Sequence, residues 1–576
     1  MTKKSAPTPR LHALWQWLDD KKVLFALTAF LFALIPLYPK LPLADLITGY
    51  IVRLRLEDLI IGIAGVVWLI QLIRRKISLK TPLTIIITLY LLVGLASSYS
   101  AVFVLYTVPV PINMKPSIIK MITTQSLPLE LFHVAKLLLH YFRRVEYFAL
   151  FFIAYAAIKE KQQVKKLIAI FSISALLVAV YGFGQKYLYW PVYSTMNREF
   201  SKGLRLYLTE HARVQSTFGG HYDFAAYLVM ALPLVLSLFF YFKNRNTKIL
   251  LAVTYLLSLW GLMMTSSRSS FLAYVAAITI VLVLFAFRKG LIWFLTRAAV
   301  VYGCTAVFFY MFGDLSQRFS QIFTGSGALD TFQTTVEEIK TKAQQPFVEP
   351  PKDGISIDDV AKAAAEAEKI AAKKPVIDQS DTQPTPVEPL PPDVFVDVPA
   401  EVITTTSPTG KEVTVEIPRV FSENAHRLGL SAAIRLDTLW PFAIRGFLRN
   451  PWLGSGYSTL TKYTNLEFTE AESTDNDFLR TLGETGALGF ITFYGVMVVA
   501  LVSTWRAVWK TDDAYLSVLA IAFTAATVGL LINAVYIDVF ISSKVIQVYW
   551  IFTALVLAYA KLSVRPEQKA VSKAKA

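Results

Sequence analysis

The sequence predicts an all-α polytopic membrane protein with about twelve transmembrane helices and one large external loop between helices nine and ten. Composition is the first reason. Of the 576 residues, 55% are hydrophobic and 17% are charged, whereas soluble domains carry about 25% charged residues. The second reason is a series of apolar runs, several of which exceed the roughly 18 residues at which a run predicts a transmembrane helix.

The predicted spans centre on apolar runs at 23–38, 59–73, 83–104, 147–158, 167–185, 224–242, 249–264, 271–287, 291–312, 481–504, 515–539 and 545–562. The fourth run is short. The helical pattern of the residues before it, L-E-L-F-H-V-A-K-L-L-L-H-Y-F-R-R, predicts that its helix begins earlier. No small-residue cleavage site follows the first run, so we expect a retained helix rather than a signal peptide.

Basic residues occur in alternate short loops, before the first span and after the last, with loop clusters at 74–76, 159–166, 243–248 and 288–289. Because cytoplasmic loops carry an excess of Lys and Arg, we expect a protein of the cytoplasmic (inner) membrane with both termini in the cytoplasm. The net charge is +16. The basic residues of the chain flank its apolar runs instead of forming one patch, so we expect membrane lipids and no nucleic acid as partners.

The predicted external loop, 313–475, separates an N-terminal membrane domain of about nine helices, 1–312, from C-terminal membrane helices, 476–563, and a cytoplasmic tail, 564–576. It holds 24 of the 41 acidic residues. Its middle, about 341–420, holds 12 of the 27 prolines and predicts a disordered linker with one short helix. Residues 421–449 have helical apolar spacing and predict an amphipathic helix that packs over the outer membrane face.

Several common functional motifs are absent from the sequence. It contains no phosphate-binding G-x-x-x-x-G-K-[ST], no G-x-G-x-x-G after a strand, and no H-E-x-x-H. Its single cysteine, Cys304, permits no disulfide within one chain, and its six histidines are scattered. We therefore expect no metal site and no cofactor, and a cytosolic engine driven by nucleotide hydrolysis is disfavoured.

Three arginines from distant parts of the sequence are predicted to reach the outer face. Arg213 precedes the sixth span, Arg268 lies in the short turn between spans seven and eight, and Arg435 lies in the loop helix. Guanidinium groups bind phosphate oxygens in a bidentate manner, so a cluster of them suits a pyrophosphate headgroup. The plainer alternatives are an interfacial anchor for Arg213 and a solvated helix face for Arg435. A charge held near the bilayer, such as Arg268, usually marks function.

The stretch S-T-D-N-D-F-L-R-T-L-G-E-T-G-A-L-G-F, at 473–490, has a structural and a functional interpretation. Thr474 and Asp477 have the spacing of a capping box, and the glycines are typical of close helix packing in membranes. Glu484 lies one turn into a predicted membrane helix and must face protein or water, where it is suited to hold an arginine. Spacing alone favours structure over chemistry for Asp475 and Asn476.

Four stretches together resemble the O-antigen ligase and O-antigen polymerase family of integral membrane glycosyltransferases. They are R-V-Q-S-T-F-G-G-H-Y-D-F-A-A-Y-L-V-M-A-L-P-L from Arg213, T-S-S-R-S-S-F-L around Arg268, R-L-D-T-L-W-P-F-A-I-R-G-F-L-R-N-P-W-L-G-S-G-Y from Arg435, and the stretch at 473–490. The resemblance covers roughly 200–312 and 421–560. Each motif is weak alone, and their order and topology carry the resemblance.

The resemblance implies a membrane glycosyltransferase of the C-like fold type. Such an enzyme moves a glycan from an undecaprenyl-pyrophosphate carrier to a glycan or lipid acceptor outside the cytoplasmic membrane, without nucleotide. Its expected protein partners are a flippase and a chain-length regulator. Arg213, Arg268 and Arg435 would bind pyrophosphate.

The resemblance also implies the catalytic residues. Ligases of the family place a histidine before the Asn that aligns with Asn476, but Asp475 occupies that position here. The departure favours a polymerase over a ligase that uses a lipid A-core or protein acceptor. Asp475 would be the base or would orient an arginine, with Arg268 and Glu484 in support. His211 and His221 are alternative sources of a base.

A transporter, such as a flippase for lipid-linked oligosaccharides, is the competing interpretation, because it would bind the same headgroup. Transporters usually place charged sites near the membrane midplane, at the broken helices of paired repeats. The sequence shows no internal repeat, and the three arginines are predicted at one face. We therefore favour an enzyme.

Overall fold

The computed structural model describes residues 21–47, 52–105, 131–196, 199–312, 401–406, 412–417, 430–463, 468–470 and 473–575. The chain divides into two units. The first comprises Met1–Thr324, Gly446–Thr459 and Ser473–Ala576, and the second comprises Gly325–Arg445 and Leu460–Glu472. Part of the predicted external loop, Gly446–Thr459, therefore belongs with the membrane helices.

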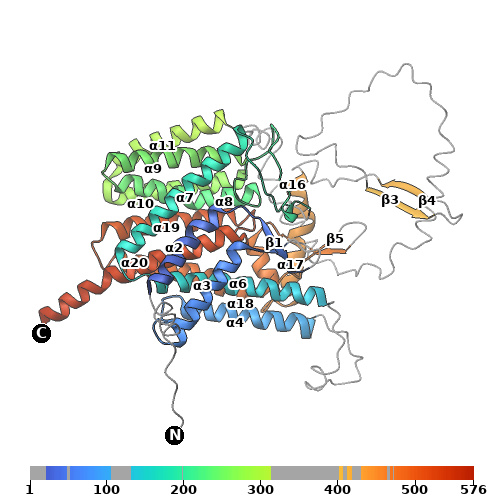
Figure 1. Ribbon diagram of the computed structural model, residues 1–576, viewed down its shortest axis with the longest axis horizontal. Coiled ribbons are helices and arrows are strands. Elements are labelled where there is room, and N and C mark those ends of the chain that lie inside the picture. The colour runs from blue at the N-terminus through green and yellow to red at the C-terminus, as the bar shows by residue number, and fades with distance from the viewer. Residues whose placement is uncertain are drawn as a thin grey trace, which may run out of the picture. The chain divides into compact units, whose positions relative to one another are not determined.

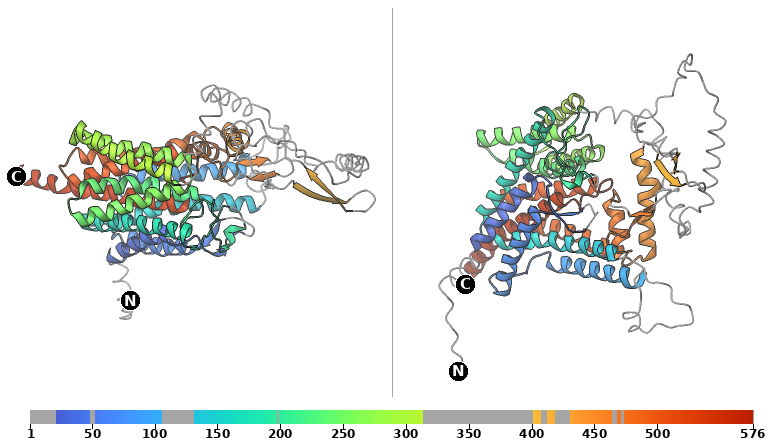
Figure 2. Two further views of the ribbon diagram at one scale, coloured as in Figure 1. Left: turned by 90° about the horizontal axis from the view of Figure 1, so that it is seen from above. Right: turned by 45° about the vertical axis from the view of Figure 1, so that its right-hand side comes forward.

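Long helices make up most of the first unit and run side by side (Figure 1 and Figure 2). They are α2 (Lys21–Leu37), α3 (Leu56–Ile73), α4 (Thr84–Ser100) with its π-helical extension η1 (Ala101–Leu105), α6 (Leu131–Ala157), α7 (Lys161–Tyr187), α8 (His221–Tyr241), α9 (Arg245–Met264), α10 (Arg268–Lys289), α11 (Leu291–Met311), α18 (Asp477–Val508), α19 (Ala514–Asn533) and α20 (Ser543–Lys575). A hairpin of β1 (Pro42–Asp45) and β2 (Arg53–Arg55) joins α2 to α3. The 3-10 turn η2 (Phe200–Lys202) lies between α7 and α8.

Within the described part of the chain, ten helices are long and apolar enough to cross a membrane. The chain is therefore an all-α polytopic membrane protein. The predicted set of twelve spans differs from these ten at two places. The first predicted span is the shorter apolar helix Lys22–Leu37, and the fourth lies inside α6, which combines apolar and charged residues.

Helix α6 begins well before the predicted fourth span, as the helical pattern of the preceding residues indicated. Lys136, His140 and Arg144 recur every four residues, which places them along one face of the helix. All three are buried, with 3%, 7% and 5% of their surface exposed. Arg143, beside them, pairs with Asp58 at 2.8 Å. A charged face of this kind marks α6 as a helix that packs against protein rather than only against lipid.

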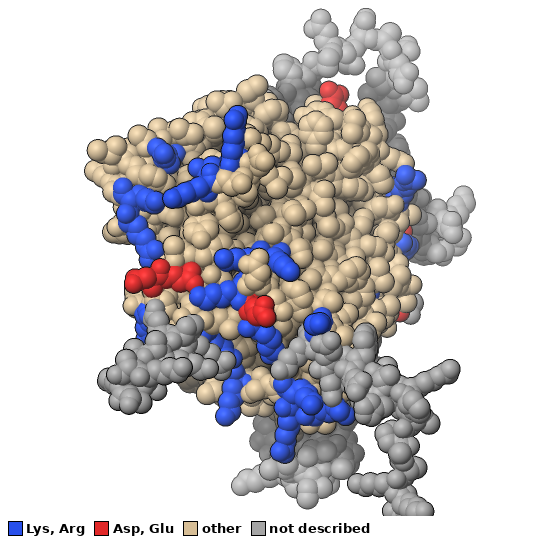
Figure 3. Space-filling view, turned by 60° about the vertical axis from the view of Figure 1, so that its left-hand side comes forward, with Lys and Arg blue, Asp and Glu red and all other residues tan. Residues whose placement is uncertain are grey.

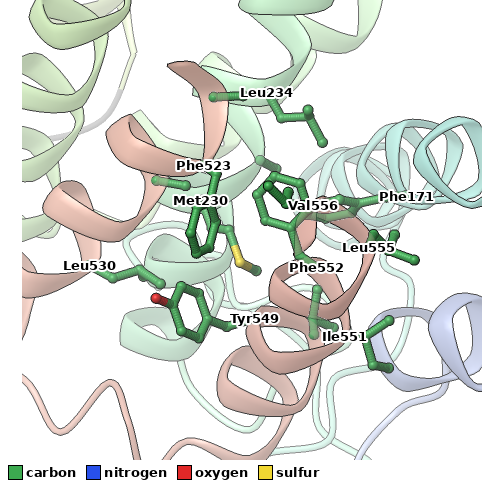
Figure 4. Close-up of a cluster of buried hydrophobic side chains, with 14 of the residues drawn as sticks. Phe171, Met230, Leu234, Phe523, Leu530, Tyr549, Ile551, Phe552, Leu555 and Val556 are labelled. Carbon is green, nitrogen blue, oxygen red and sulfur yellow. The ribbon is translucent and has the colours of Figure 1, made fainter. Parts of the chain in front are cut away.

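Helices α8, α19 and α20 lie at the centre of the first unit. Between 78% and 89% of the residues in their most apolar windows are buried. Figure 4 shows part of this centre, where Phe171, Met230, Phe523 and Phe552 approach one another from α7, α8, α19 and α20. The corresponding share for α11 is 11%, so α11 packs at the edge of the bundle and presents most of its surface outward.

The end of the first unit from which α20 extends carries many Lys and Arg side chains and few Asp and Glu side chains (Figure 3). The basic connections between α3 and α4, α6 and α7, and α8 and α9 reach this end, since each follows the carboxyl end of a helix that points there (Figure 1). This distribution is the one that the alternating basic loops predicted.

The second unit contains two antiparallel hairpins, β3 (Glu401–Thr406) with β4 (Glu412–Ile417) and β5 (Thr461–Tyr463) with β6 (Phe468–Glu470). Its helical elements are α16 (Leu430–Ala433), the π-helical η3 (Ile434–Leu439) and most of α17 (Trp440–Arg449). The predicted linker at 341–420 missed the β3–β4 hairpin, although E-V-I-T-T-T and E-V-T-V-E-I are rich in β-branched residues. Residues 421–429 of the predicted loop helix, and most of the predicted linker, lie outside the described residues.

Candidate functional site

The start of α18 is capped by Asn476. Its side-chain oxygen accepts a hydrogen bond from the Leu479 amide at 3.0 Å. The predicted capping box, with Thr474 as the N-cap, is therefore wrong: the N-cap lies two residues later, at Asn476. Asn is as favourable at an N-cap as Ser or Thr, so the residue type alone did not distinguish the two positions. Asp477 is instead buried, and its Oδ2 accepts a hydrogen bond from the Phe540 amide at 2.8 Å.

Asp538, in the connection between α19 and α20, organises the segment before α18. Its carboxylate accepts hydrogen bonds from the amides of Thr474 at 2.9 Å and Asn476 at 3.1 Å, and from the Ser473 hydroxyl at 2.8 Å. Arg480 donates to the same carboxylate from Nη1, also at 2.8 Å. Sequence analysis missed Asp538. Its signal was an acidic residue near the end of the predicted eleventh span, 515–539, where a charge usually marks function.

Arg480 lies between two carboxylates inside the first unit. Its Nε is 3.1 Å from Glu484 Oε1, one helical turn away, and its Nη1 contacts Asp538. Only 4% of the Arg480 side chain and 3% of the Glu484 side chain are exposed. Glu484 also accepts a hydrogen bond from the Ser458 amide at 3.1 Å. Glu484 thus holds an arginine, but that arginine is Arg480, which sequence analysis did not select.

Helix α18 is broken at Gly486, whose φ of +66° and ψ of −169° lie outside the helical region. A Cβ atom there would lie 2.4 Å from the Trp452 carbonyl carbon. Gly454 has a φ of +69°, and a Cβ on it would lie 2.4 Å from the Glu484 carbonyl carbon. Both positions require glycine because two backbones meet there, at a separation that no side chain permits.

The loop N-P-W-L-G-S-G-Y, at 450–457, satisfies the backbone groups that the break exposes. Broken helices in membranes need such partners, because unpaired amides and carbonyls are costly away from water. Four backbone hydrogen bonds join the loop to α18, from Ser455 N to Gly483 O (2.8 Å), Gly456 N to Glu484 O (2.9 Å), Ala487 N to Pro451 O (2.8 Å) and Leu488 N to Trp452 O (3.2 Å).

Arg144 of α6 lies in the same region. Its guanidinium carbon lies 5.6 Å from the centre of the Tyr457 ring. Its Nη1 has no hydrogen-bond partner within the described residues, although Arg144 is 5% exposed. Arg144, Arg480 and Glu484 line one small cavity of about 10 Å³. The sequence signal for Arg144 was the four-residue spacing of Lys136, His140 and Arg144, which was not used.

Arg213 and His221 meet at the start of α8, where Arg213 Nη1 is 2.9 Å from His221 Nε2. A guanidinium group has only donors, so Nε2 accepts this hydrogen bond and the imidazole carries its proton on Nδ1. The Val214 amide donates to the Met264 carbonyl at 3.1 Å, which fixes this loop against the end of α9. His221 therefore holds Arg213 in place and has its Nε2 lone pair occupied.

Lys40 adds a cation to the α8 loop. Its Nζ lies 3.0 Å from Asp223 Oδ2. Burial lowers the pKa of Lys40 below its ordinary value, with Asp223 opposing this shift and Arg55 adding to it. Lys40 was not predicted because its partner is 183 residues away along the chain.

Lys544, at the start of α20, secures the same loop from the other side. Its Nζ donates hydrogen bonds to the carbonyls of Thr217, at 2.8 Å, and Tyr38. The Nζ also lies 5.1 Å from the centre of the Phe218 ring. Lys544 thus holds the loop that carries Arg213, and Lys40 holds the first turn of α8 that follows it, which together limit the positions that Arg213 can adopt.

Arg268 is the first residue of α10 and is half-buried. Two hydrogen bonds attach the starts of α10 and α18 to the end of α19. Ser270 donates to the Asn533 side-chain oxygen at 3.1 Å, and the Asp477 amide donates to the neighbouring Ala534 carbonyl at 2.9 Å. The structure therefore brings the starts of α10 and α18 together at the end of α19.

The remaining predicted site residues, Asp475, His211 and Arg435, differ in how far they are buried. Asp475 is half-buried, has a φ of +53° and accepts a 2.5 Å hydrogen bond from the Ser473 hydroxyl. His211 is exposed. Arg435 is buried within η3 of the second unit, and its convergence with Arg213 and Arg268 stays a prediction.

The described residues contain no group of three or more His, Cys, Asp or Glu side chains placed to hold a metal ion. In the first unit, the half-buried Arg213 and Arg268 lie just before α8 and at the start of α10. The buried Asp477, Arg480 and Glu484 lie in the first turns of α18, and the half-buried Asp475 lies just before them. A comparison with models of known protein families gave no match, and neither did a comparison with curated proteins.

Proposed function

We propose that this chain is a membrane glycosyltransferase. It would polymerise glycans carried on polyprenyl pyrophosphate at the outer face of the cytoplasmic membrane. The observation that carries this proposal is the set of half-buried and buried cations and carboxylates at the starts of α8, α10 and α18. That end of the helices is opposite the end of α8 and α10 that leads to basic loops. Basic loops mark the cytoplasmic side, so the cluster would face outward, with both termini in the cytoplasm.

The proposed reaction forms one glycosidic bond and breaks one sugar–phosphate bond. The acceptor hydroxyl attacks the anomeric carbon and loses its proton, and polyprenyl pyrophosphate departs with the bonding electrons. Arg213 and Arg268 would bind this leaving group, and their half-buried positions strengthen their attraction for its growing charge compared with fully solvated side chains. Arg144 Nη1 offers a further donor for a substrate oxygen.

Asp475 is the proposed proton acceptor. Its carboxylate is half-buried and stands on a segment that Asp538 fixes in place. A general base must be both accessible and positioned, and Asp475 meets both conditions. His221 is the weaker candidate, because its Nε2 is occupied by Arg213. Glu484 is weaker as well, because it is paired with Arg480.

A ligase that transfers the glycan to a lipid A-core or protein acceptor is the nearest alternative. It would use the same pyrophosphate site and differ only in the acceptor. A flippase is the alternative from another class. The positions of Arg213 and Arg268, before α8 and at the first residue of α10, favour an enzyme, since transporters usually bind their substrates near the midplane.

The test uses a strain that lacks the protein and expresses Arg268→Ala or Asp475→Asn. The matched control is Arg288→Ala, an exposed arginine in the last turn of α10. Surface glycan and the carrier-linked pool are sized, and the amount of each variant in the membrane is measured. A polymerase defect leaves single repeat units. Long polymer retained on the carrier would indicate a ligase instead, and short intermediates trapped on the inner face would indicate a flippase. Normal glycan in both variants would overturn the site assignment.

A further inference from the structure

A cavity of about 330 Å³ lies between α8, α9 and α11, at the edge of the first unit. This volume is within the usual range for sites that bind small molecules. Its lining residues are Leu236, Phe239, Phe240, Lys248, Ala252, Tyr255, Leu256, Trp293, Arg297, Val300, Val301 and Cys304. None of them is acidic.

The lining changes from cationic to apolar along the helices. Lys248 lies in the first turn of α9, and Arg297 lies in the second turn of α11. Each cation is placed near an aromatic ring, with Lys248 Nζ 5.5 Å from the centre of Phe239 and Arg297 Cζ 5.9 Å from that of Trp293. The rest of the lining is almost entirely apolar. An amphiphile with an anionic head has the complementary distribution of charge.

The outer wall of the cavity is formed by α11, of which only 11% is buried within the chain. Leu291, Ile292, Leu295 and Val300 of this helix are exposed. In a bilayer such side chains contact acyl chains, so a lipid has direct access to the cavity from the side.

The cavity mouth lies in the leaflet opposite the proposed catalytic site. Lys248 is near the start of α9, whereas the Arg213 loop is bonded to Met264 at its end. A helix of 20 residues is about 30 Å long, which is the thickness of the hydrocarbon core. The headgroup of an outward-facing donor therefore cannot reach Lys248.

We propose that this cavity binds one anionic phospholipid, whose phosphate contacts Lys248 and Arg297 and whose acyl chain fills the apolar part. Basic pockets between transmembrane helices are typical sites for anionic headgroups. The bound lipid would fasten α11 to α8 and α9. This inference does not rest on the proposed glycosyltransferase activity.

The test is native mass spectrometry of the full chain, released from micelles that contain phosphatidylglycerol or phosphatidylethanolamine. We expect one tightly retained phosphatidylglycerol. The double variant Lys248→Gln/Arg297→Gln should bind it about 30-fold more weakly, since each basic residue near the membrane surface contributes about a factor of five. The control pair Lys243→Gln/Arg288→Gln removes two basic residues outside the cavity lining and should bind as the wild type does.

A third variant distinguishes a lipid that is bound inside the cavity from one that is attracted only to the positive charge of Lys248 and Arg297. Ala252→Trp fills the cavity and leaves both cations in place, so it should also lose the retained lipid. Circular dichroism and thermal unfolding confirm that each variant is folded. Equal retention of the two lipids by the wild type would overturn the proposal. So would unchanged phosphatidylglycerol binding in the double variant or in Ala252→Trp.

Discussion

The two ends of the membrane unit carry positive charge in different ways. At the end from which α20 extends, Lys and Arg side chains such as Arg288 and Lys289 are exposed. At the other end, Arg480, Lys40 and Lys544 are buried, and each contacts carboxylates or carbonyls. Exposed cations remain solvated and need no partner. A buried cation is costly unless it is paired, so its position is tightly determined by the groups around it.

This difference is the reason why we assign the proposed chemistry to the end with the buried cations. A cation that moves freely in water binds phosphate weakly and without a fixed geometry. A guanidinium held by neighbours in a dry site is already oriented before substrate arrives, which makes its electrostatic effect on a reaction large. The exposed end, in contrast, carries an excess of Lys and Arg of the kind that is typical of cytoplasmic loops.

The largest difference between the two ends should appear when a buried ion pair is broken. Glu484→Ala leaves Arg480 buried with one carboxylate and removes the acceptor for the Ser458 amide. We expect a loss of about 3–5 kcal/mol in the free energy of unfolding. Thermal unfolding in detergent measures it, with exposed Arg288→Ala expected to change stability by less than about 0.5 kcal/mol. Equal losses of stability in the two variants would contradict the difference between buried, paired charges and exposed ones.

Gly486→Ala should produce the next largest effect. Alanine is strained at a φ of +66°, and its Cβ would overlap the Trp452 backbone. We expect a loss of about 2–4 kcal/mol and a displaced 450–457 loop. Gly303→Ala in α11 is the matched control, because no atom lies within 4 Å of its added Cβ. Hydrogen exchange of the loop amides measures the displacement, and unchanged exchange in Gly486→Ala would refute it.

Substitution of His221 should affect activity more than stability. His221→Leu removes the acceptor for Arg213 and should slow glycan transfer about tenfold or more, through a raised KM for the donor. His221→Gln keeps an acceptor and should restore part of this loss. Initial rates over a range of donor concentrations distinguish the two variants. Equal loss in both, with unchanged KM, would instead make His221 a catalytic base.

The smallest effect is expected at Asp513, the N-cap of α19, near the exposed end. Burial alone would raise its pKa, but hydrogen bonds from Lys161, the Leu516 amide and Ser563 outweigh burial, and the pKa of Asp513 is lowered. Its contribution is therefore present above the ordinary Asp pKa of about 3.9 and is lost as pH falls through the lower folded value. Asp513→Asn should cost under about 1 kcal/mol near pH 7, measured by unfolding across pH. If the stability difference between Asp513→Asn and the wild type grew as the pH was lowered, the pKa of Asp513 would not be lowered in the folded state.

Fold class was accessible from the sequence because membrane helices need long apolar runs, whatever their tertiary neighbours. The same reasoning extended α6 beyond its apolar part. The β3–β4 hairpin was not predicted, because the high proline content of residues 341–420 favoured a linker over the strand pattern at 401–417. The N-cap was placed at Thr474 rather than Asn476, since several polar residues in succession each qualify as caps.

The candidate site was accessible only in part. Arg213 and Arg268 lie in recognisable stretches beside predicted spans. Asp538, Arg144 and Lys40 do not, because their roles depend on partners far away in the sequence. Arg144 meets Tyr457 only after α6 and the 450–457 loop have packed together. Pairings of this kind follow from the tertiary arrangement, and no local spacing encodes them.

The break at Gly486 has a consequence for how the chain is inserted during synthesis. Residues 487–508 alone measure about 33 Å as a helix, enough to cross a bilayer. The two turns before the break carry Asp477, Arg480 and Glu484, and they are not needed for the crossing. The insertion machinery can therefore accept the apolar part as a complete span. The charged turns then need to form only after the 450–457 loop and Asp538 have reached their positions beside them. Asp477, Arg480 and Glu484 therefore need never enter the lipid without partners.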